Sequence, residues 1–301
     1  MSAGIAKATA DNSAQIEFWN GRVGETWARY QERLDRAFTS FTDRLVAGAA
    51  PRPGERLIDV GCGCGDLALA LAARVGPQGQ VLGIDVSKPM LERAQQRAEG
   101  LLAGGHAPLS FLEADASLHD FPAAYDLLAS RFGVMFFADP SAAFANLRRA
   151  LKPGGRFAFL CWRELSANPW VALPLAQVAD LPGGQQQSDP LAPGPFALAD
   201  RQRTCRIFVE AGFADCVAVQ VDGDVVLGRV GGGAEAQSGA VADALELSLR
   251  TGPVGAILRE ADDDLKQEVR RRITKFLGSI ARDGAVTLPG SCWLYTGRNP
   301  A

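Results

Sequence analysis

A glycine-rich segment is the first feature of this chain that points to chemistry. It reads Gly61-Cys62-Gly63-Cys64-Gly65 and is followed by Asp66. A glycine turn between a strand and a helix lets a ligand lie against bare backbone, and the helix N-terminus favours an anionic group such as a carboxylate. In a dinucleotide-binding turn the third glycine or alanine comes five positions after the first, which here is Asp66. The spacing therefore predicts a nucleoside-like ligand that lacks a pyrophosphate.

Two further carboxylates agree with a nucleoside-like ligand. Asp85 ends the second predicted strand, where its side chain would accept hydrogen bonds from both ribose hydroxyls. Asp115 ends the third, where it would meet an adenine amino group. Either acid alone could equally be a helix cap or a solvated loop residue. Their placement at successive strand ends favours the binding role for both.

Hydrophobic periodicity indicates the elements that position these residues. Apolar residues recur at helical spacing over residues 14–49, and Pro51, Pro53 and Gly54 end that segment. Short apolar runs then alternate with helical patterns, which predicts a parallel sheet covered by helices on both faces. The predicted strands are 56–60, 80–84, 109–113, 125–130 and 156–162, and the predicted helices are 66–75, 88–100 and one that ends at 147–151.

The second half of the chain is less regular. Its predicted elements are a helix over 200–211, a strand over 217–221 that turns at Asp222-Gly223, an amphipathic helix over 258–280 and a last strand over 291–295. Two stretches look inserted, namely 165–199, which is rich in Pro and Gly, and about 231–289, which is mostly helical.

The chain resembles the class I S-adenosylmethionine-dependent methyltransferases over at least residues 50–162. The motifs that match are the glycine turn, Asp85, Glu113-Ala114-Asp115-Ala116 and Leu151-Lys152-Pro153-Gly154-Gly155 before the fifth strand. Within that superfamily the chain is similar to the branch related to ubiquinone and menaquinone C-methyltransferases. The resemblance implies an α/β fold with a Rossmann-like, doubly wound, seven-stranded sheet, mostly parallel with the last strand antiparallel, and helical lid insertions.

The resemblance also implies three segments and a cofactor. The segments are an N-terminal helical lid (1–50), a cofactor-binding α/β core (51–163) and a remainder (164–301) that completes the sheet and holds the two inserted segments as lids. The implied cofactor is S-adenosyl-L-methionine, with the three glycines along its methionine part, Asp85 on the ribose, and Asp115 with Ala116 around the adenine. The residues expected to contact it are Trp27, Gly61, Cys62, Gly63, Gly65, Asp85, Val86, Met90, Asp115 and Ala116.

Methyl transfer from a sulfonium is an in-line displacement, so the enzyme mainly needs to align the acceptor and exclude water. We expect a small, partly apolar acceptor, including aromatic or quinone-like molecules, methylated at oxygen or carbon. For a phenol, hydroxyl or activated carbon acid a general base would help, and His119, which follows a strand end, is a candidate. The other interpretation of His119 is a polar loop residue.

Arg131 follows the fourth predicted strand, at the sheet edge where open α/β folds bind ligands. It would orient an anionic or oxygen-rich acceptor, or else form a surface salt bridge. The apolar residues 132–137 that follow predict core packing, the wall of a substrate pocket, or some of each. Four aromatic residues would close over cofactor and acceptor, although aromatic residues at helical spacing also serve plain packing. They are Trp19, Trp27, Tyr30 and Trp162.

Composition excludes several other classes. The chain has 301 residues, with 31 Lys plus Arg against 34 Asp plus Glu, a net charge of −3, and lacks the basic run of a nucleic-acid binder. It contains no stretch of about 18 uncharged apolar residues, so we expect no membrane span. Six scattered cysteines fit reduced thiols and offer no zinc ligand set. We therefore expect a cytoplasmic protein with a small-molecule partner and no metal; the sequence does not predict its oligomeric state.

Two other functions remain open at this point. One is a nicotinamide-dependent oxidoreductase, although its turn would tolerate Asp66 poorly. The other is a cofactor-binding protein without turnover, in which the acceptor pocket is filled or serves a partner.

Overall fold

The computed structural model describes residues 12–100, 105–184, 189, 191–232, 235–259 and 261–300. Residues 1–11 of the predicted N-terminal lid lie outside this description, as do 185–188, 190, 233, 234 and 260 of the two predicted insertions. The elements in chain order are α1 (Ser13–Asn20), α2 (Arg22–Arg29), α3 (Gln31–Ala49), β1 (Arg56–Val60), α4 (Asp66–Val75), β2 (Gln80–Asp85), α5 (Lys88–Glu99), β3 (Leu109–Glu113), β4 (Tyr125–Arg131), η1 (Gly133–Phe136), α6 (Pro140–Ala150), β5 (Leu151–Trp162), η2 (Leu165–Ala167), α7 (Pro169–Ala176), α8 (Arg201–Glu210), β6 (Ala214–Arg229), α9 (Ala236–Arg250), α10 (Gly252–Leu258), α11 (Asp263–Ile280) and β7 (Ala285–Arg298).

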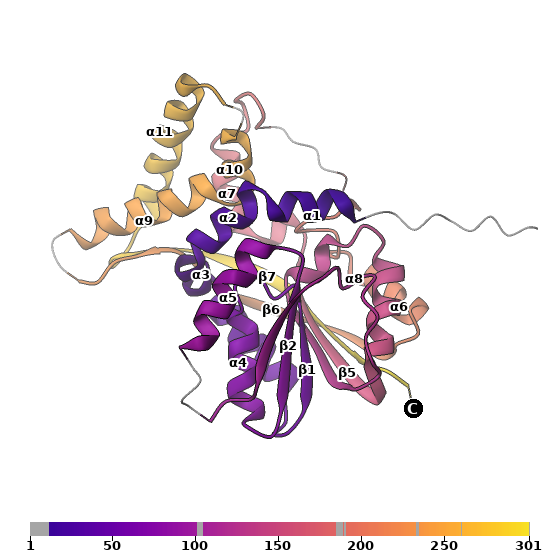
Figure 1. Ribbon diagram of the computed structural model, residues 1–301. Helices are drawn as coiled ribbons and strands as arrows, with labels where there is room; N and C mark the ends of the chain where they lie inside the picture. The colour runs from indigo at the N-terminus through magenta and orange to yellow at the C-terminus, as the bar shows by residue number, and fades with distance from the viewer. Residues whose placement is uncertain are drawn as a thin grey trace, which may run out of the picture.

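One seven-stranded sheet organises the molecule, with the strand order β3-β2-β1-β4-β5-β7-β6 (Figure 1). The pairings from β3 through β5 are parallel, and β7 is antiparallel to both of its neighbours. The predicted doubly wound sheet with an antiparallel last strand is therefore confirmed. The chain leaves β1 toward β2 on one side and later returns to β4 on the other, which creates a topological switch point between β1 and β4.

Helices cover both faces of the sheet, as the alternating pattern predicts. α3, α4 and α5 lie on one face and α6 and α8 on the other (Figure 1). α4 shows why: Leu67, Leu71 and Val75 recur on one side of the helix and are all buried against the strands. Burial of such faces on a largely buried sheet supplies most of the stabilisation of this layered core.

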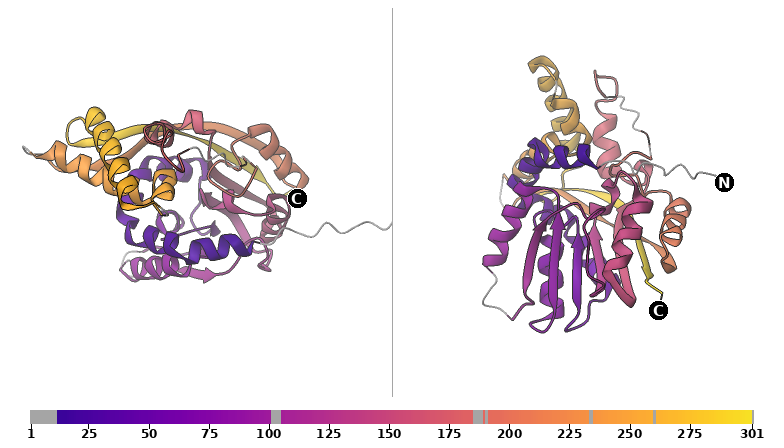
Figure 2. Two further views of the ribbon diagram at one scale, coloured as in Figure 1. Left: turned by 90° about the horizontal axis from the view of Figure 1, so that it is seen from above. Right: turned by 45° about the vertical axis from the view of Figure 1, so that its right-hand side comes forward.

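The N-terminal helical segment is broken into three helices, of which α1 and α2 lie over the carboxyl edge of the sheet (Figures 1 and 2). The break between α1 and α2 is at Gly21, as its glycine content suggests, but Gly24 lies inside α2. A Cβ atom on Gly24 would collide with the backbone of Trp19 and come within 2.6 Å of Ser87 Oγ. Gly24 therefore permits a close approach of α1, α2 and the β2–α5 turn.

The last two strands are longer than the alternation in the sequence indicated. β6 and β7 pair continuously from Ala214 opposite Arg298 to Arg229 opposite Ala285, so the predicted turn at Asp222-Gly223 is wrong. A Cβ atom on Gly223 would lie 3.0 Å from Ser40 Oγ and 3.2 Å from the Phe41 ring of α3. The glycine therefore allows α3 to pack closely on the strand, and it does not reverse the chain.

The two inserted segments form helices next to the end of this hairpin. The first contains η2 and α7, and the second contains α9, α10 and α11, with the predicted helix over 258–280 divided between α10 and α11. α9 packs on β6, and α10 packs on both α9 and α7. Figures 1 and 2 show α9 and α11 projecting beyond the sheet on the side of β6 and β7. Within the described ranges no helix has the length and apolar character needed to cross a bilayer.

Candidate functional site

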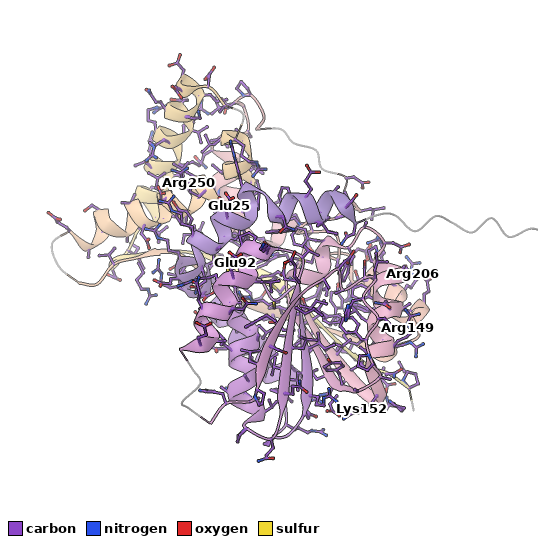
Figure 3. All side chains as sticks on the ribbon, in the orientation of Figure 1. Glu25, Glu92, Arg149, Lys152, Arg206 and Arg250 are labelled. Atoms are coloured by element: carbon purple, nitrogen blue, oxygen red, sulfur yellow. The ribbon has the colours of Figure 1, made fainter. Side chains whose placement is uncertain are left out.

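A cavity, which we call the first cavity, opens at the carboxyl edge of the sheet where β1 and β4 meet. The space within it, including the part that is open to solvent, measures about 1080 Å³. Lys152, labelled in Figure 3, marks the opposite edge of the sheet, where it binds Asp126. The predicted site residues that line the first cavity are Trp27, Gly61, Cys62, Gly63, Asp85, Val86, Met90, Asp115, Ala116 and Arg131.

The glycine turn forms the floor of the first cavity because its backbone adopts conformations that favour glycine. Gly61 and Gly63 have φ angles of +67° and +52°. A Cβ atom on Gly61 would lie 2.6 Å from the Cα atom of Gly133, which opens η1. Two glycine backbones thus touch here, and a side chain at either position would fill the cradle.

Gly65 does not line the first cavity, contrary to its predicted contact with the cofactor. It is the left-handed N-cap of α4, with a φ of +83°. A Cβ atom there would lie 3.1 Å from Ala94 Cβ and 3.2 Å from the Phe111 ring. The third glycine therefore serves the packing of the turn against α5 and β3.

Asp85 ties the glycine turn to the beginning of α5. It is buried, its Oδ2 accepts a hydrogen bond from the Gly63 N–H at 2.8 Å, and its Oδ1 accepts one from the Ser87 N–H at 2.8 Å. Burial raises the pKa of the carboxyl, and these N–H groups oppose that rise. Each carboxylate oxygen has two lone pairs, so Asp85 retains acceptor capacity for ligand hydroxyls.

Asp115 has one satisfied and one unsatisfied oxygen. Its Oδ1 accepts hydrogen bonds from the Ser117 N–H at 2.9 Å and the Ser117 hydroxyl at 2.7 Å. Its Oδ2 is buried and finds no hydrogen-bond partner within the described part of the chain. Because Asp115 and Ala116 both line the first cavity, Oδ2 is suited to an amino group of a ligand.

Asp59 also lines the first cavity and was missed by the sequence analysis. It is 1% exposed, and neither carboxylate oxygen has a hydrogen-bond partner among the residues described. Burial raises its pKa to about 8, even though the nearby Arg131 guanidinium acts in the opposite direction. An acid within the apolar strand Leu57-Ile58-Asp59-Val60 was the available signal, because buried strands rarely contain an unpaired charge.

Aspartates and arginines alternate along one wall of the first cavity. Arg131 forms an ion pair and hydrogen bond with Asp66 and also donates to the Thr42 hydroxyl. Arg97 binds Asp35 at 2.8 Å and lies 3.8 Å from Asp66. Arg131 thus lines the first cavity, where its Nη1 is paired with Asp66 and Thr42.

Asp35 of α3 offers a carboxylate oxygen to the first cavity and was also missed. Gln31 Nε2 and Arg97 Nη2 both bind its Oδ2, and no other described group hydrogen-bonds to Oδ1. Burial, and secondarily the Asp66 charge, raise the pKa of Asp35. No sequence signal identifies it, because a polar residue on an amphipathic helix usually faces water.

His119 does not line the first cavity. Its ring packs edge-on against Phe121 at 4.6 Å, and its backbone N–H donates to the Asp115 carbonyl at 2.9 Å. The loop that follows β3 turns back at Asp115, and the imidazole of His119 lies outside the first cavity. The structure therefore does not bring this predicted base to the site.

The roof of the first cavity, which we define as α1 and α2, is fixed by hydrogen bonds to the β2–α5 turn. The Ser87 hydroxyl donates to the Trp19 carbonyl at 2.6 Å. Asn20 Nδ2 donates to the Val86 carbonyl at 2.7 Å, and Asn20 Oδ1 accepts from the Lys88 N–H at 3.0 Å. Trp19 contacts the Trp27 ring edge-on, with the centroids 5.6 Å apart. The roof thus places an aromatic, water-excluding surface over the glycine turn.

Comparison with known proteins gives the family of the core. Residues 57–155 match the methyltransferase domain family. The chain is 38% identical over 123 residues (40% of this chain, 54% of the relative) to the aklanonic acid methyltransferase of Streptomyces sp. strain C5. It is 36% identical over 148 residues (49% and 53%) to the ubiquinone/menaquinone biosynthesis C-methyltransferase of Bordetella avium strain 197N. The chain thus spans about half the length of these curated relatives.

A solved structure shows the same fold at low sequence identity. It is Haemonchus contortus phosphoethanolamine N-methyltransferase 2 in complex with S-adenosyl-L-methionine, with a TM-score of 0.53 and 16% identity over 98% of this chain and 61% of that one.

The residues around the first cavity fit that cofactor. Gly61 and Gly133 have no room for a Cβ atom, and Asp59 and Asp115 hold buried oxygens without hydrogen-bond partners among the described residues. These oxygens suit the amino groups at the two ends of an adenosyl amino acid, and Asp85 suits its sugar. Residues 57–155 of the α/β core therefore match the methyltransferase domain family, and the residues around the first cavity fit S-adenosyl-L-methionine.

Proposed function

We propose that this protein transfers a methyl group from S-adenosyl-L-methionine to oxygen or carbon of a small, partly apolar acceptor. The observation that supports this most strongly is the set of carboxylates around a glycine turn: Asp59 and Asp85 are buried, and Asp115 has a buried Oδ2 atom. The bound cofactor would supply an electrophilic methyl group on a sulfonium. Gly61 and Gly63 would carry its amino-acid part, with Asp59 facing the ammonium group.

The acceptor would lie between an aromatic and a charged wall. Phe132, Phe136 and Trp19 line the first cavity together with Asp35 and Asp66. Two relatives are named for aklanonic acid and for ubiquinone and menaquinone biosynthesis, which supports an aromatic or quinone-like acceptor here. Such a molecule presents a flat apolar body to the rings and a hydroxyl to the carboxylates.

We assign to Asp35 the role of accepting a proton from the acceptor. Arg97 and Gln31 orient its Oδ2, which leaves Oδ1 to receive the proton of a bound hydroxyl or carbon acid. The raised pKa of Asp35 makes it a stronger base than an exposed carboxylate. Asp35 therefore replaces His119 as the candidate base in this proposal.

One experiment tests both halves of the proposal. Calorimetry with S-adenosylhomocysteine measures cofactor binding, and transfer of labelled methyl groups to a panel of hydroquinones and phenols measures turnover. Asp85→Ala should weaken binding at least tenfold, because a carboxylate that orders the turn and binds the sugar is lost. Asp35→Asn should leave binding within twofold and lower kcat by roughly 10²–10⁴. Asp224→Ala, an exposed aspartate on β6, is the control.

Absence of binding by the wild-type chain, or equal binding by Asp85→Ala, would rule out the proposed cofactor site. Unchanged kcat in Asp35→Asn would remove Asp35 from proton transfer but leave the cofactor site intact. Binding without transfer to any acceptor would favour a cofactor-binding protein without turnover.

A further inference from the structure

Arg97 of α5 connects the glycine turn with Asp35 of α3. Its Nη1 donates a hydrogen bond to the Cys64 carbonyl at 2.6 Å, and its Nη2 lies 2.8 Å from Asp35 Oδ2. The two nitrogens belong to one planar guanidinium group, so both partners are fixed relative to each other. The Arg97 side chain is only 18% exposed, so water screens these contacts in part. One residue thus joins the floor of the first cavity to the candidate base.

A second arginine of α5 acts on Asp35 through Gln31. Arg93 lies one helical turn before Arg97, on the same side of α5. Its Nε donates to Gln31 Oε1 at 3.1 Å, and Gln31 Nε2 donates to Asp35 Oδ2. An arginine can only donate, so the amide oxygen of Gln31 must face Arg93 and its NH₂ group must face the other way. Arg93 thus holds the buried Gln31 amide in the orientation that serves Asp35.

Both contacts end on the same oxygen of Asp35. Gln31 and Arg97 bind Oδ2, and no group within the described ranges hydrogen-bonds to Oδ1. A carboxylate that is held through one oxygen keeps its plane fixed and directs the other oxygen. Catalytic bases are commonly oriented in this way by a further group behind them. The arginines of α5 therefore restrain Asp35 and leave Oδ1 free for a ligand in the first cavity, which Asp35 lines.

The charge of Arg97 also acts on the protonation of Asp35. Burial, and secondarily the Asp66 carboxylate, raise the pKa of Asp35, and the Arg97 guanidinium is the strongest of the groups that lower this pKa. Loss of Arg97 would therefore raise the pKa of Asp35 further and leave less of the carboxylate ionised. The groups that interact with Asp35 come from separate parts of the fold: Gln31 of α3, Cys64 of the glycine turn, Asp66 of α4, Arg97 of α5 and Arg131 of β4.

We propose that Arg97 is a positioning residue that holds Asp35 in place against the cofactor-binding turn, and that Arg93 completes this orientation through Gln31. Neither arginine is among the residues that line the first cavity, so both act through the groups they bind. This inference rests on the proposed function, because it takes Asp35 as the proton acceptor. It adds that the cofactor floor and the base form one hydrogen-bonded unit, so that a change at Arg97 must affect both.

Three variants of the whole chain test this assignment. Arg97→Gln removes the charge and both contacts, Arg97→Lys keeps the charge without the planar pair of donors, and Arg93→Gln frees only the Gln31 amide. Arg74→Gln, the same change at an exposed position of α4, is the matched control. Calorimetry measures S-adenosylhomocysteine affinity, and kcat is measured as a function of pH with an acceptor from the hydroquinone and phenol panel.

A further measurement reports on Asp35 without turnover. The NMR chemical shift of its carboxyl carbon, assigned by its absence in Asp35→Asn, is followed as a function of pH in each variant. Because a base must be ionised to accept a proton, kcat falls as pH drops through the pKa of Asp35. The acid limb of the kcat profile and the NMR titration should therefore move together.

For Arg97→Gln, S-adenosylhomocysteine affinity should fall roughly three- to tenfold, because the Cys64 carbonyl loses its donor. kcat should fall roughly 10- to 100-fold because the base is misplaced, and the acid limb should move to higher pH. Arg97→Lys should keep the acid limb near its wild-type position but still lower kcat, because one ammonium group does not reproduce two coplanar contacts. Arg93→Gln should lower kcat and leave affinity equal to that of Arg74→Gln.

Equal kcat profiles for Arg97→Gln and Arg74→Gln, together with a loss of kcat in Asp35→Asn, would overturn this proposal and leave the proposed function in place. A lower kcat in Arg97→Gln with an unchanged pKa of Asp35 and an unchanged acid limb would show a merely structural role and would also overturn it. Unchanged kcat in Asp35→Asn would remove the base itself and this proposal with it.

Discussion

Asp59 is the residue at which the electrostatics of the site are most unusual. Its carboxyl is 1% exposed and has no hydrogen-bond partner within the described residues, and burial raises its pKa to about 8. An ionised carboxylate in such a place is unstable unless a cation approaches it. The residue therefore lowers the stability of the unliganded protein in favour of a positively charged ligand group, as binding sites often do.

This predicts a specific effect of Asp59→Asn on stability as a function of pH. The folded-state pKa of about 8 lies above the ordinary value of 3.8, so between these values the folded chain holds a proton that the unfolded chain releases. This group's contribution to the free energy of unfolding therefore falls as pH rises. Between pH 5 and pH 8, the free energy of unfolding of Asp59→Asn should therefore rise by up to about 4 kcal/mol relative to that of the wild type.

Urea unfolding of the unliganded wild type and Asp59→Asn at pH 5 and pH 8 measures how the difference between their free energies of unfolding changes with pH. Asp224→Asn, at an exposed position, provides the control and should show no pH-dependent gain. A difference between Asp59→Asn and wild type that does not change with pH would mean that Asp59 is already ionised in the folded protein.

At the scale of elements, the cofactor floor depends on two backbones that touch. The turn after β1 and the beginning of η1 after β4 meet at Gly61 and Gly133, where only hydrogen atoms fit between the chains. Gly61 also has a positive φ. A positive φ alone does not define the cradle, because several glycines with a positive φ have no atom near the position of a Cβ.

Gly76 separates these two effects, because it has a similar φ of +64° but no atom within 4 Å of a Cβ placed there. Gly76→Ala should cost roughly 1–3 kcal/mol of stability, because a φ of +64° with a ψ of −176° is a conformation that only glycine adopts readily. It should leave S-adenosylhomocysteine affinity unchanged. Gly61→Ala should cost roughly 2 kcal/mol or more and weaken binding at least tenfold, because the turn must move away from Gly133. Equal binding by the two variants would show that the contact with Gly133 does not shape the site.

The elements of the core were predictable from local patterns. Arg56–Val60 is a short apolar run because the strand is buried, and Asp66–Val75 has helical periodicity because one face of the helix is buried. Any layered fold imposes these two patterns. The β6–β7 hairpin was underestimated, because Asp222, Gly223 and Asp224 carry the usual signals of a turn. Their conformation is fixed instead by pairing with residues almost 70 positions later and by α3 above them.

At the scale of the whole molecule, the cofactor side and the acceptor side differ in how far they can be read from sequence. Asp85 and Asp115 were predictable because the carboxyl ends of parallel strands share one edge of the sheet. Asp35 and Leu34 were not, since they reach the cavity only when α3 packs across the sheet. The position of His119 outside the first cavity was not predictable either, because it depends on the turn that the loop makes at Asp115.

The acceptor side is assembled from segments that are distant in the chain. α3 and η1 line the first cavity, and residues of α7, β6, α9 and α10 lie against α3 on its other side. Ion pairs hold this arrangement: Asp243 of α9 binds Arg33 at 2.7 Å and Arg36, both on α3. Most of these segments lie outside the 57–155 stretch that matches the methyltransferase domain.

The most direct test of the account is a crystal structure of the full chain with S-adenosylhomocysteine. The account predicts the adenine amino group at Asp115 Oδ2, the ribose hydroxyls at Asp85, and the amino-acid end along Gly61 and Gly63 with its ammonium group facing Asp59. The sulfur atom should face the space between Phe132 and Asp35. A ligand bound elsewhere, or bound here with Asp59 and Asp115 still without partners, would contradict the assignment of the cavity.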